Sequence, residues 1–253
     1  MTQPNFKRVQ KRNPHQLAVD QHIHAAHCIR KFADEKGTVA VFDKSLSRWV
    51  QRKPDAAIFC AKRAWDQRSE KGYMISIETA FFNVINNINT SLTERKHDDI
   101  SRYYHLWRLR GLARDKERQN VHFNKVSGHR LTIDEQEILE KNGYSFILEN
   151  DGLLHHLASG IEIQVMLAKI CHDMGNIKWG LLTARRGEFL VADYYPGDSF
   201  GLEPFIPVSP KHAFFANTLD SGIDVYQVRE LNRASISSSG NYFFCRTLEK
   251  CPF

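Results

Sequence analysis

The sequence RYYHLWRLRGLARDKER, residues 102–118, predicts a helix with aromatic and basic side chains along one stripe. Steps of four, three and four residues separate the members of this stripe, which are Tyr103, Trp107, Arg110 and Arg114. Such a stripe can hold a nucleic-acid strand, because bases stack on aromatic rings while arginine pairs with phosphate. The alternative is an amphipathic helix with Tyr103 and Trp107 in the core and the arginines in solvent. The residues predicted to bind nucleic acid are Arg102, Tyr103, Trp107, Arg108, Arg114 and Arg118.

Periodic segments before and after this helix predict further helices and one hairpin. Apolar residues recur with helical period in SIETAFFNVINNI (76–88), and the alternation in TVAVFDKS (38–45) and RWVQRK (48–53) predicts a β-hairpin. Thr132 and Glu135 have the spacing of a capping box, which starts a helix that Gly143 ends. A longer helix follows, with Leu157 and Val165 on its expected buried stripe.

The last third of the chain changes to short strands, IKWGLL, EFLVAD, FIPV and HAFFA, with a helix expected at DVYQVRELN. We therefore expect an α+β fold with a helix-rich first two thirds, a small hairpin, and short, mostly antiparallel strands in the last third. Residues 1–16 are polar and basic and are expected to form a flexible arm. Residues 17–253 are expected to form a single domain, because no Pro/Gly/Ser-rich linker divides them.

Charge is distributed unevenly along the chain of 253 residues. Residues 1–130 hold 25 Lys and Arg against 13 Asp and Glu, whereas residues 131–253 hold 10 against 16. The basic half predicts contact with nucleic acid or with an acidic protein. The five cysteines occur without a CxxC pair, and no apolar run approaches the roughly 20 residues that cross a bilayer. We expect a cytoplasmic protein without membrane contact.

Histidines provide two candidate metal sites. His22, His24 and His27 lie close together in QHIHAAHC, but a continuous helix would turn His22 away from the other two. His172 and Asp173 in LAKICHDMGN resemble the signature of HD-domain phosphohydrolases, in which both side chains bind a metal ion that activates water. The alternative is a histidine that stabilises a helix C-terminus beside an exposed aspartate.

Several short segments together resemble one prokaryotic family, catalogued as domain of unknown function 4238. They are the segment from His22 to Phe32, VFDK, SIETAF, LWRLRG, KWGLL, FLVADYYPG, FIPVSP and the late ELN. The chain departs from the family pattern where the family has glutamine, here Trp107, and in its Ser-Asp-Asn-Pro turn, here residues 192–196. The positions that the resemblance carries over are His22, Arg30, Glu78, Arg110, Trp179, Asp193, Pro207, Pro210 and Asn232. The family name implies no activity.

Four of these positions have the chemistry of a catalytic site, namely His22, Glu78, Arg110 and Asp193. Together they could form an acid–base or single-metal site with an arginine for phosphate, as hydrolysis of a phosphodiester requires. The metal would be a divalent ion such as Mg²⁺ or Mn²⁺. The alternatives are a buried ion pair of Glu78 with Arg30 or Arg110, and an Asx turn at Asp193.

These observations favour a cytoplasmic prokaryotic or phage protein that acts on or binds nucleic acid, such as a nuclease-like effector. A non-catalytic module that binds an acidic protein or RNA is the second interpretation. A metal-dependent phosphohydrolase of the HD type is the third.

Overall fold

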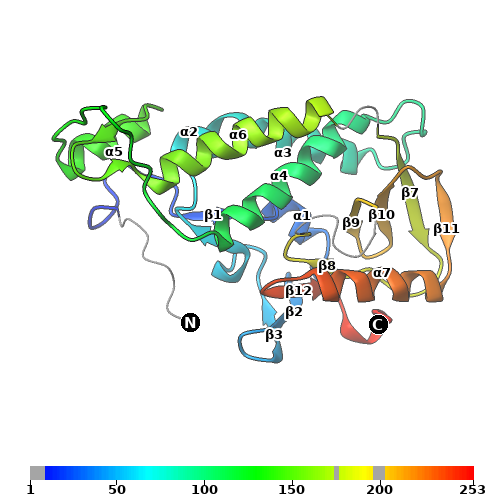
Figure 1. Cartoon of the computed structure of the whole chain (residues 1–253). Helices are drawn as coiled ribbons and strands as arrows, with labels where there is room; N and C mark the ends of the chain where they lie inside the picture. Colours follow the sequence, from blue (N-terminus) through cyan, green and yellow to red (C-terminus); the bar gives the residue numbers. More distant parts are fainter. Residues whose placement is uncertain (1–8, 174–176, 196–202) are drawn as a thin grey trace.

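The computed structural model describes residues 9–173, 177–195 and 203–253, in which helices and strands alternate along the chain (Figure 1). The helices are α1 (Ala26–Arg30), α2 (Gln67–Ser69), α3 (Ile75–Asn86), α4 (His97–Asp115), α5 (Ile133–Lys141), α6 (His155–Asp173) and α7 (Val225–Ser238). The strands are β1 (Asp20–His22), β2 (Val39–Asp43), β3 (Arg48–Arg52), β4 (Cys60–Lys62), β5 (Ile147–Leu148), β6 (Gly152–Leu153), β7 (Trp179–Ala184), β8 (Val191–Ala192), β9 (Phe205–Ser209), β10 (His212–Ala216), β11 (Ser221–Ile223) and β12 (Tyr242–Cys245). None of the helices described here has the combined length and apolar character that a membrane crossing requires.

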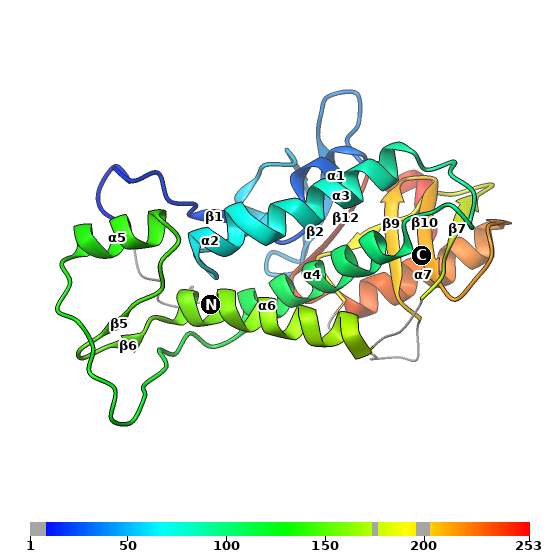
Figure 2. The same ribbon diagram turned by 90° about the horizontal axis from the view of Figure 1, so that it is seen from above.

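Helix α4 lies at the centre of a helical layer. It packs between α3 and α6, and the three helices run side by side (Figure 2). Ile100, Leu106 and Leu109 are all buried although they lie on different sides of α4. The helix is therefore enclosed over more than half of its circumference and contacts its neighbours on several faces.

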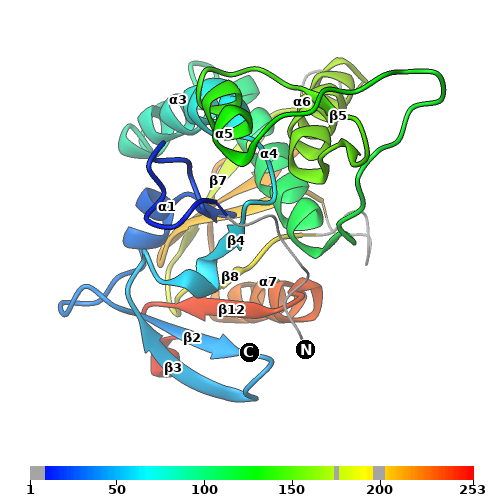
Figure 3. The ribbon, with the colours of Figure 1, turned by 90° about the vertical axis from the view of Figure 1, so that its left-hand side faces the viewer.

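Two four-stranded sheets complete the architecture. The first has the order β11–β7–β10–β9, with β7 antiparallel to β10 and parallel to β11. The second has the order β3–β2–β12–β8. Strands β2, β3 and β12 lie with α7 on the opposite side of the molecule from α3 and α6 (Figure 3). Two small sheets, β1–β4 and β5–β6, lie outside this arrangement.

The α+β class is confirmed, but the expected layout is wrong. Strands are spread through the chain, since β1 to β4 all lie before residue 63 and α7 follows most of the later strands. The predicted hairpin is present, with Val41 opposite Val50. Its strand β2 has a second edge, which β12 covers by placing Phe243 opposite Phe42. Pairing between segments two hundred residues apart leaves no local pattern in the sequence, which is why this sheet was not predicted.

Residues 9–16 lie against α5. The backbone N–H of Gln10 donates to Glu137 Oε1 at 2.7 Å, and His15 Nε2 lies 2.8 Å from Asp134 Oδ1. This part of the predicted flexible arm is therefore docked on the domain, through contacts that its amino-acid composition does not predict. Residues 1–8 of the same prediction lie outside the described residues.

Gly111 permits a close approach between α4 and Tyr194, because a Cβ at this position would overlap the Tyr194 ring. We expect Gly111→Ala to lower the free energy of unfolding by about 1–3 kcal/mol, since overpacking outweighs the better helix propensity of alanine. Urea denaturation measures the change. The neighbouring exposed residue provides the control, and Leu112→Ala should stay within about 0.5 kcal/mol of the wild type. Equal stability of Gly111→Ala and the wild type would contradict the close packing.

Candidate functional site

Among the predicted catalytic residues, Arg110 lies at the centre of a cluster of charged side chains. Its buried guanidinium donates through Nη1 to Glu78 Oε1 of α3, and its Nη2 lies 3.7 Å from Glu70 Oε2. The guanidinium carbon lies 5.3 Å from the ring centre of Trp65, whose Nε1 donates to Glu70 Oε2 at 2.6 Å. Burial alone lowers the pKa of Arg110, but the charges of Glu78 and Glu70 outweigh this effect and raise it. The cluster is therefore a buried ion pair with a second carboxylate nearby.

His24 is a buried neutral group beside this ion pair. Its Nδ1 lies 2.9 Å from the Tyr103 hydroxyl, and its ring centre lies 4.4 Å from that of Trp107. Burial, followed by the effect of positive groups that include Arg110, lowers the pKa of His24 to about 3. The imidazole is therefore uncharged at neutral pH and packs as an aromatic ring of the core.

Asp193, which follows β8, forms a second ion pair with Arg114. Arg114 lies one turn after Arg110 on α4. The Oδ2 of Asp193 lies 2.8 Å from Arg114 Nη2, and the Asp193 side chain is fully buried. The carboxylate also accepts the backbone N–H groups of Gly240 at 2.9 Å and Asn241 at 2.8 Å. These bonds involve both carboxylate oxygens and tie α4 to the loop before β12.

His22 lies apart from both ion pairs, since its Nε2 is 3.2 Å from the backbone oxygen of Pro54. Among the described contacts, none joins His22 to Glu78, Arg110 or Asp193. The structure thus brings together only Glu78 and Arg110 of the four predicted catalytic residues. The remaining two are placed in separate polar contacts, so the four side chains do not form one acid–base site.

The aromatic members of the predicted nucleic-acid stripe lie inside the protein. Tyr103 is buried and stacks on Phe81 with 4.0 Å between ring centres, and Trp107 is also buried. Their rings are not open to bases, and their burial matches the amphipathic-helix alternative. That alternative is wrong for Arg110, which is buried and not in solvent. Of the other predicted contact residues, one is exposed, Arg102, and three are half-buried, Arg108, Arg114 and Arg118.

The predicted metal sites gain no ligand set from the described part of the chain. His172 is exposed on the last turn of α6, and the side chain of Asp173 lies outside the described residues. Within the described ranges, no three His, Cys, Asp or Glu side chains are grouped so that they could hold a metal ion. This applies to a Mg²⁺ or Mn²⁺ site at Glu78, whereas the HD-type site includes Asp173, whose side chain lies outside the described residues.

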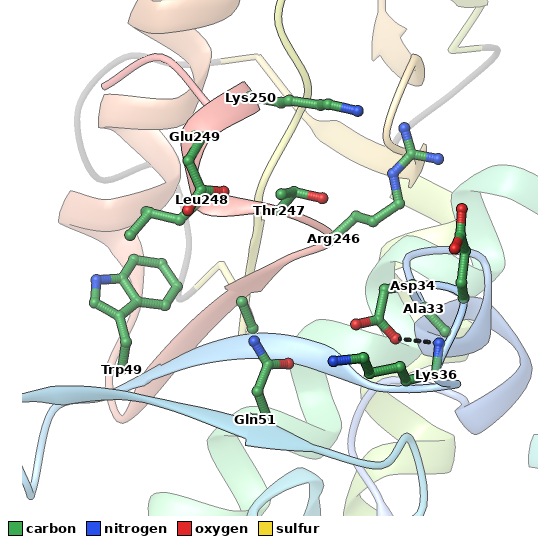
Figure 4. Close-up of a pocket in the computed structure, with 12 residues that line it drawn as sticks. Ala33, Asp34, Lys36, Trp49, Gln51, Arg246, Thr247, Leu248, Glu249 and Lys250 are labelled. Atoms are coloured by element: carbon green, nitrogen blue, oxygen red, sulfur yellow. Dashed lines mark hydrogen bonds between the residues drawn. The ribbon is translucent and has the colours of Figure 1, made fainter.

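Two adjoining cavities lie around residues 246–252, in a region that the sequence did not single out. The first, about 730 Å³ in volume, is lined by residues 33–36, by β2 and β3, and by residues 246–250 (Figure 4). The second, about 490 Å³, is lined by residues 185–188, Lys211, Val225 and residues 249–252. We call them the Trp49 cavity and the arginine cavity. Glu249 and Lys250 line both, so the two cavities adjoin, and we refer to them together as the groove.

Asn232 forms hydrogen bonds to two backbone segments beside the cavities, at residues 188 and 252. It is fully buried on α7, and its Nδ2 donates to the backbone oxygens of Glu188 at 2.9 Å and Pro252 at 2.8 Å. The backbone N–H of Glu188 donates to Lys250 O at 2.8 Å, and its buried carboxylate pairs with Arg246. Because Asn232 and Glu188 are buried and hydrogen-bonded, the groove is built on a fixed frame.

A local signal for the arginine cavity exists in TARRGE, residues 183–188. Gly187 has a φ of +78°, a conformation that glycine adopts readily, and it makes the turn that follows β7. Arg185 and Arg186 are exposed in this turn. Two adjacent exposed arginines at a turn can pair with an anion. They were missed because they lie in the acidic half of the chain.

The chain was compared with protein-family models, with curated proteins and with solved structures, and none of the three comparisons finds a match. The resemblance to the family of unknown function therefore stays a prediction. The function has to be argued from the geometry of this chain.

Glu78→Gln tests whether the Arg110 ion pair serves folding. The substitution leaves a buried guanidinium with Glu70 at 3.7 Å as its remaining carboxylate, so the free energy of unfolding should fall by about 3 kcal/mol. Chemical denaturation measures it. The matched control is Glu162→Gln, which breaks the exposed pair with Lys116 and should cost less than about 1 kcal/mol. A carboxylate kept for catalysis would behave differently, because its removal leaves stability equal or improved.

The buried His24 makes the free energy of unfolding depend on pH. Its pKa falls from 6.5 in the unfolded chain to about 3 in the folded protein, so between these values the unfolded chain binds the additional proton. Stability contributed by this group is therefore present above pH 6.5 and is lost as the pH falls, by up to about 1.4 kcal/mol per pH unit. Urea denaturation between pH 7 and pH 4.5 should show a smaller loss for His24→Phe than for the wild type. His172→Gln, at an exposed position, should keep the wild-type slope.

Proposed function

We propose that the protein binds single-stranded nucleic acid along the groove formed by the Trp49 cavity and the arginine cavity. The observation that carries the proposal is the charge of the arginine cavity. Its lining has more cations than carboxylates: Arg185, Arg186, Lys211 and Lys250 face Glu188 and Glu249. Arginine and lysine at a concave surface are the groups that contact phosphate oxygens.

The positive groups of this cavity are only partly neutralised by the protein. Glu188 is already paired with Arg246, which lies outside the arginine cavity. Lys211 Nζ donates to the backbone oxygen of Gly187 at 2.6 Å. Arg185 and Arg186 are exposed and have no ion pair among the described residues. An anion that enters the cavity can therefore pair with both guanidinium groups without displacing a carboxylate.

The proposal is for binding and does not extend to catalysis. A metal-dependent nuclease or an HD-type phosphohydrolase would need a ligand set for a metal ion, and the described residues, which do not include the Asp173 side chain, offer none. The expected cytoplasmic location and the prokaryotic or phage source remain part of the proposal. An acidic protein would be bound by the same arginines, and competition with the polynucleotide distinguishes the two partners.

Charge reversal in the arginine cavity tests the proposal. Arg185→Glu combined with Arg186→Glu should weaken binding of a labelled single strand at least tenfold, measured by fluorescence anisotropy. The slope of log affinity against log salt should become shallower by about 1.4, because each phosphate contact on a single strand contributes about 0.7. The control variant reverses Lys125 and Lys141, which are exposed around α5, at the far end of the molecule from the groove (Figure 1). Wild-type affinity and slope in the cavity variant would overturn the proposal.

A further inference from the structure

The Trp49 cavity has an apolar end and a polar end. Trp49 and Leu248 lie at one end, whereas Arg246, Lys36 and Asp34 lie at the other (Figure 4). Its volume of about 730 Å³ falls within the range of small-molecule sites, which is roughly 300–1,000 Å³. The cavity is therefore large enough for a planar ring together with a polar attachment.

The charges of the Trp49 cavity balance, in contrast to those of the arginine cavity. Three cations line it, Lys36, Arg246 and Lys250, together with three carboxylates, Asp34, Glu35 and Glu249. The Asp34 carboxylate is engaged locally, since its Oδ1 accepts the N–H groups of Lys36 and Thr38 at 2.9 Å each. A cavity without excess charge suits an uncharged group, and the phosphate is expected in the neighbouring arginine cavity.

Trp49 offers this cavity an aromatic ring in a fixed place. Its ring packs edge-to-face with Phe42 at 5.6 Å and Phe243 at 5.5 Å between centres, and the side chain is half-buried. The other three tryptophans, Trp65, Trp107 and Trp179, are at most 1% exposed. Trp49 is thus the tryptophan of this chain that a ligand can reach.

Gln51 adds hydrogen-bonding groups on the same face of β3. Residues two apart along a strand point to the same side, and both Trp49 and Gln51 line the cavity. The Gln51 side chain is exposed, and its Oε1 accepts from Thr38 Oγ1 at 3.2 Å, which leaves its amide N–H groups available. A primary amide can donate to the acceptors on the edge of a nucleobase.

We propose that the Trp49 cavity takes one unpaired nucleobase, stacked on Trp49 and bonded to Gln51, while the phosphate of the same nucleotide lies at Arg185 and Arg186. Lys250 lines both cavities. A base inside a duplex is stacked and paired on its edges, so it cannot enter. This inference rests on the proposed function and deepens it, because it identifies the unit of the strand that the groove recognises.

Trp49→Ala separates stacking from charge. The variant should bind a labelled single strand roughly tenfold more weakly, because the stacking of one base on an aromatic ring is lost. Its salt slope should stay at the wild-type value, since no phosphate contact is removed. Trp49→Phe keeps an aromatic ring and should recover most of the affinity. Duplex of the same sequence should bind more weakly than the single strand to the wild type.

Tryptophan fluorescence gives a second, direct measurement on the wild-type protein. Acrylamide should quench mainly Trp49, because the other tryptophans are buried. Addition of the unlabelled single strand should protect this fluorescence from acrylamide, and Trp49→Phe should remove the accessible fraction. A nucleoside monophosphate is used as the second probe, since it carries the base and phosphate without the strand.

The outcomes separate the inference from the proposed function. Unchanged affinity of Trp49→Ala and no protection of Trp49, together with weak binding by the arginine-cavity variant, would overturn the inference and leave the proposed function standing. Protection by the monophosphate without any binding of the single strand would support the base site and overturn the proposed function. If Trp49→Ala is unstable, Gln51→Ala takes its place, and full wild-type affinity in that variant would count against the bonded base edge.

Discussion

A helix enclosed on most of its sides can carry a guanidinium group only if a carboxylate meets that group inside the protein. Two of the arginines on helix α4 are held in this way, Arg110 and Arg114, one turn apart. Glu78 reaches the first from α3, and Asp193 reaches the second from the end of β8. Each pair is therefore a constraint between distant segments, because a shift of either partner would strand a buried charge. The Arg110–Glu78 pair joins two helices within the helical layer, whereas the Arg114–Asp193 pair joins that layer to the second sheet.

Local patterns in the sequence identify individual elements reliably but not their neighbours. The capping box of α5 is present, with the Thr132 backbone N–H donating to the Glu135 carboxylate at 2.8 Å. On α6, by contrast, Val165 was expected to be buried and is 61% exposed. Helical period places apolar residues on a stripe, but the packing partners decide which stripe faces inward, and the partners of α6 were unknown from the sequence. The same limit applies to β12, whose place beside β2 depends on a contact across the whole chain.

The residues of the candidate groove were not predicted from the sequence, although the ion pair of Arg110 was. Glu78 and Arg110 were chosen correctly as partners in one of the alternatives, because a carboxylate beside an apolar stripe needs a cation. The residues that line the cavities were not predicted, since the net charge of half a chain does not show where the basic residues of an acidic half lie together. Arg185, Arg186 and Lys250 belong to the acidic half and are brought together by the tie between Asn232 and residues 188 and 252. Net charge affects how readily a protein associates with charged partners in general. A binding site depends instead on which charged side chains the fold places close together.

The Trp49 cavity combines segments from both halves of the chain, so its walls become available at different times during synthesis. The hairpin β2–β3 leaves the ribosome early, since chains emerge from the N-terminus. The opposite wall of the Trp49 cavity comes from residues 246–250, and the arginine cavity is completed by residues 249–252. A nascent chain that has not yet released these residues lacks one wall of the Trp49 cavity and part of the arginine cavity. The Trp49 cavity can therefore form only after residues 246–250 have joined the hairpin, and any binding there would follow that step.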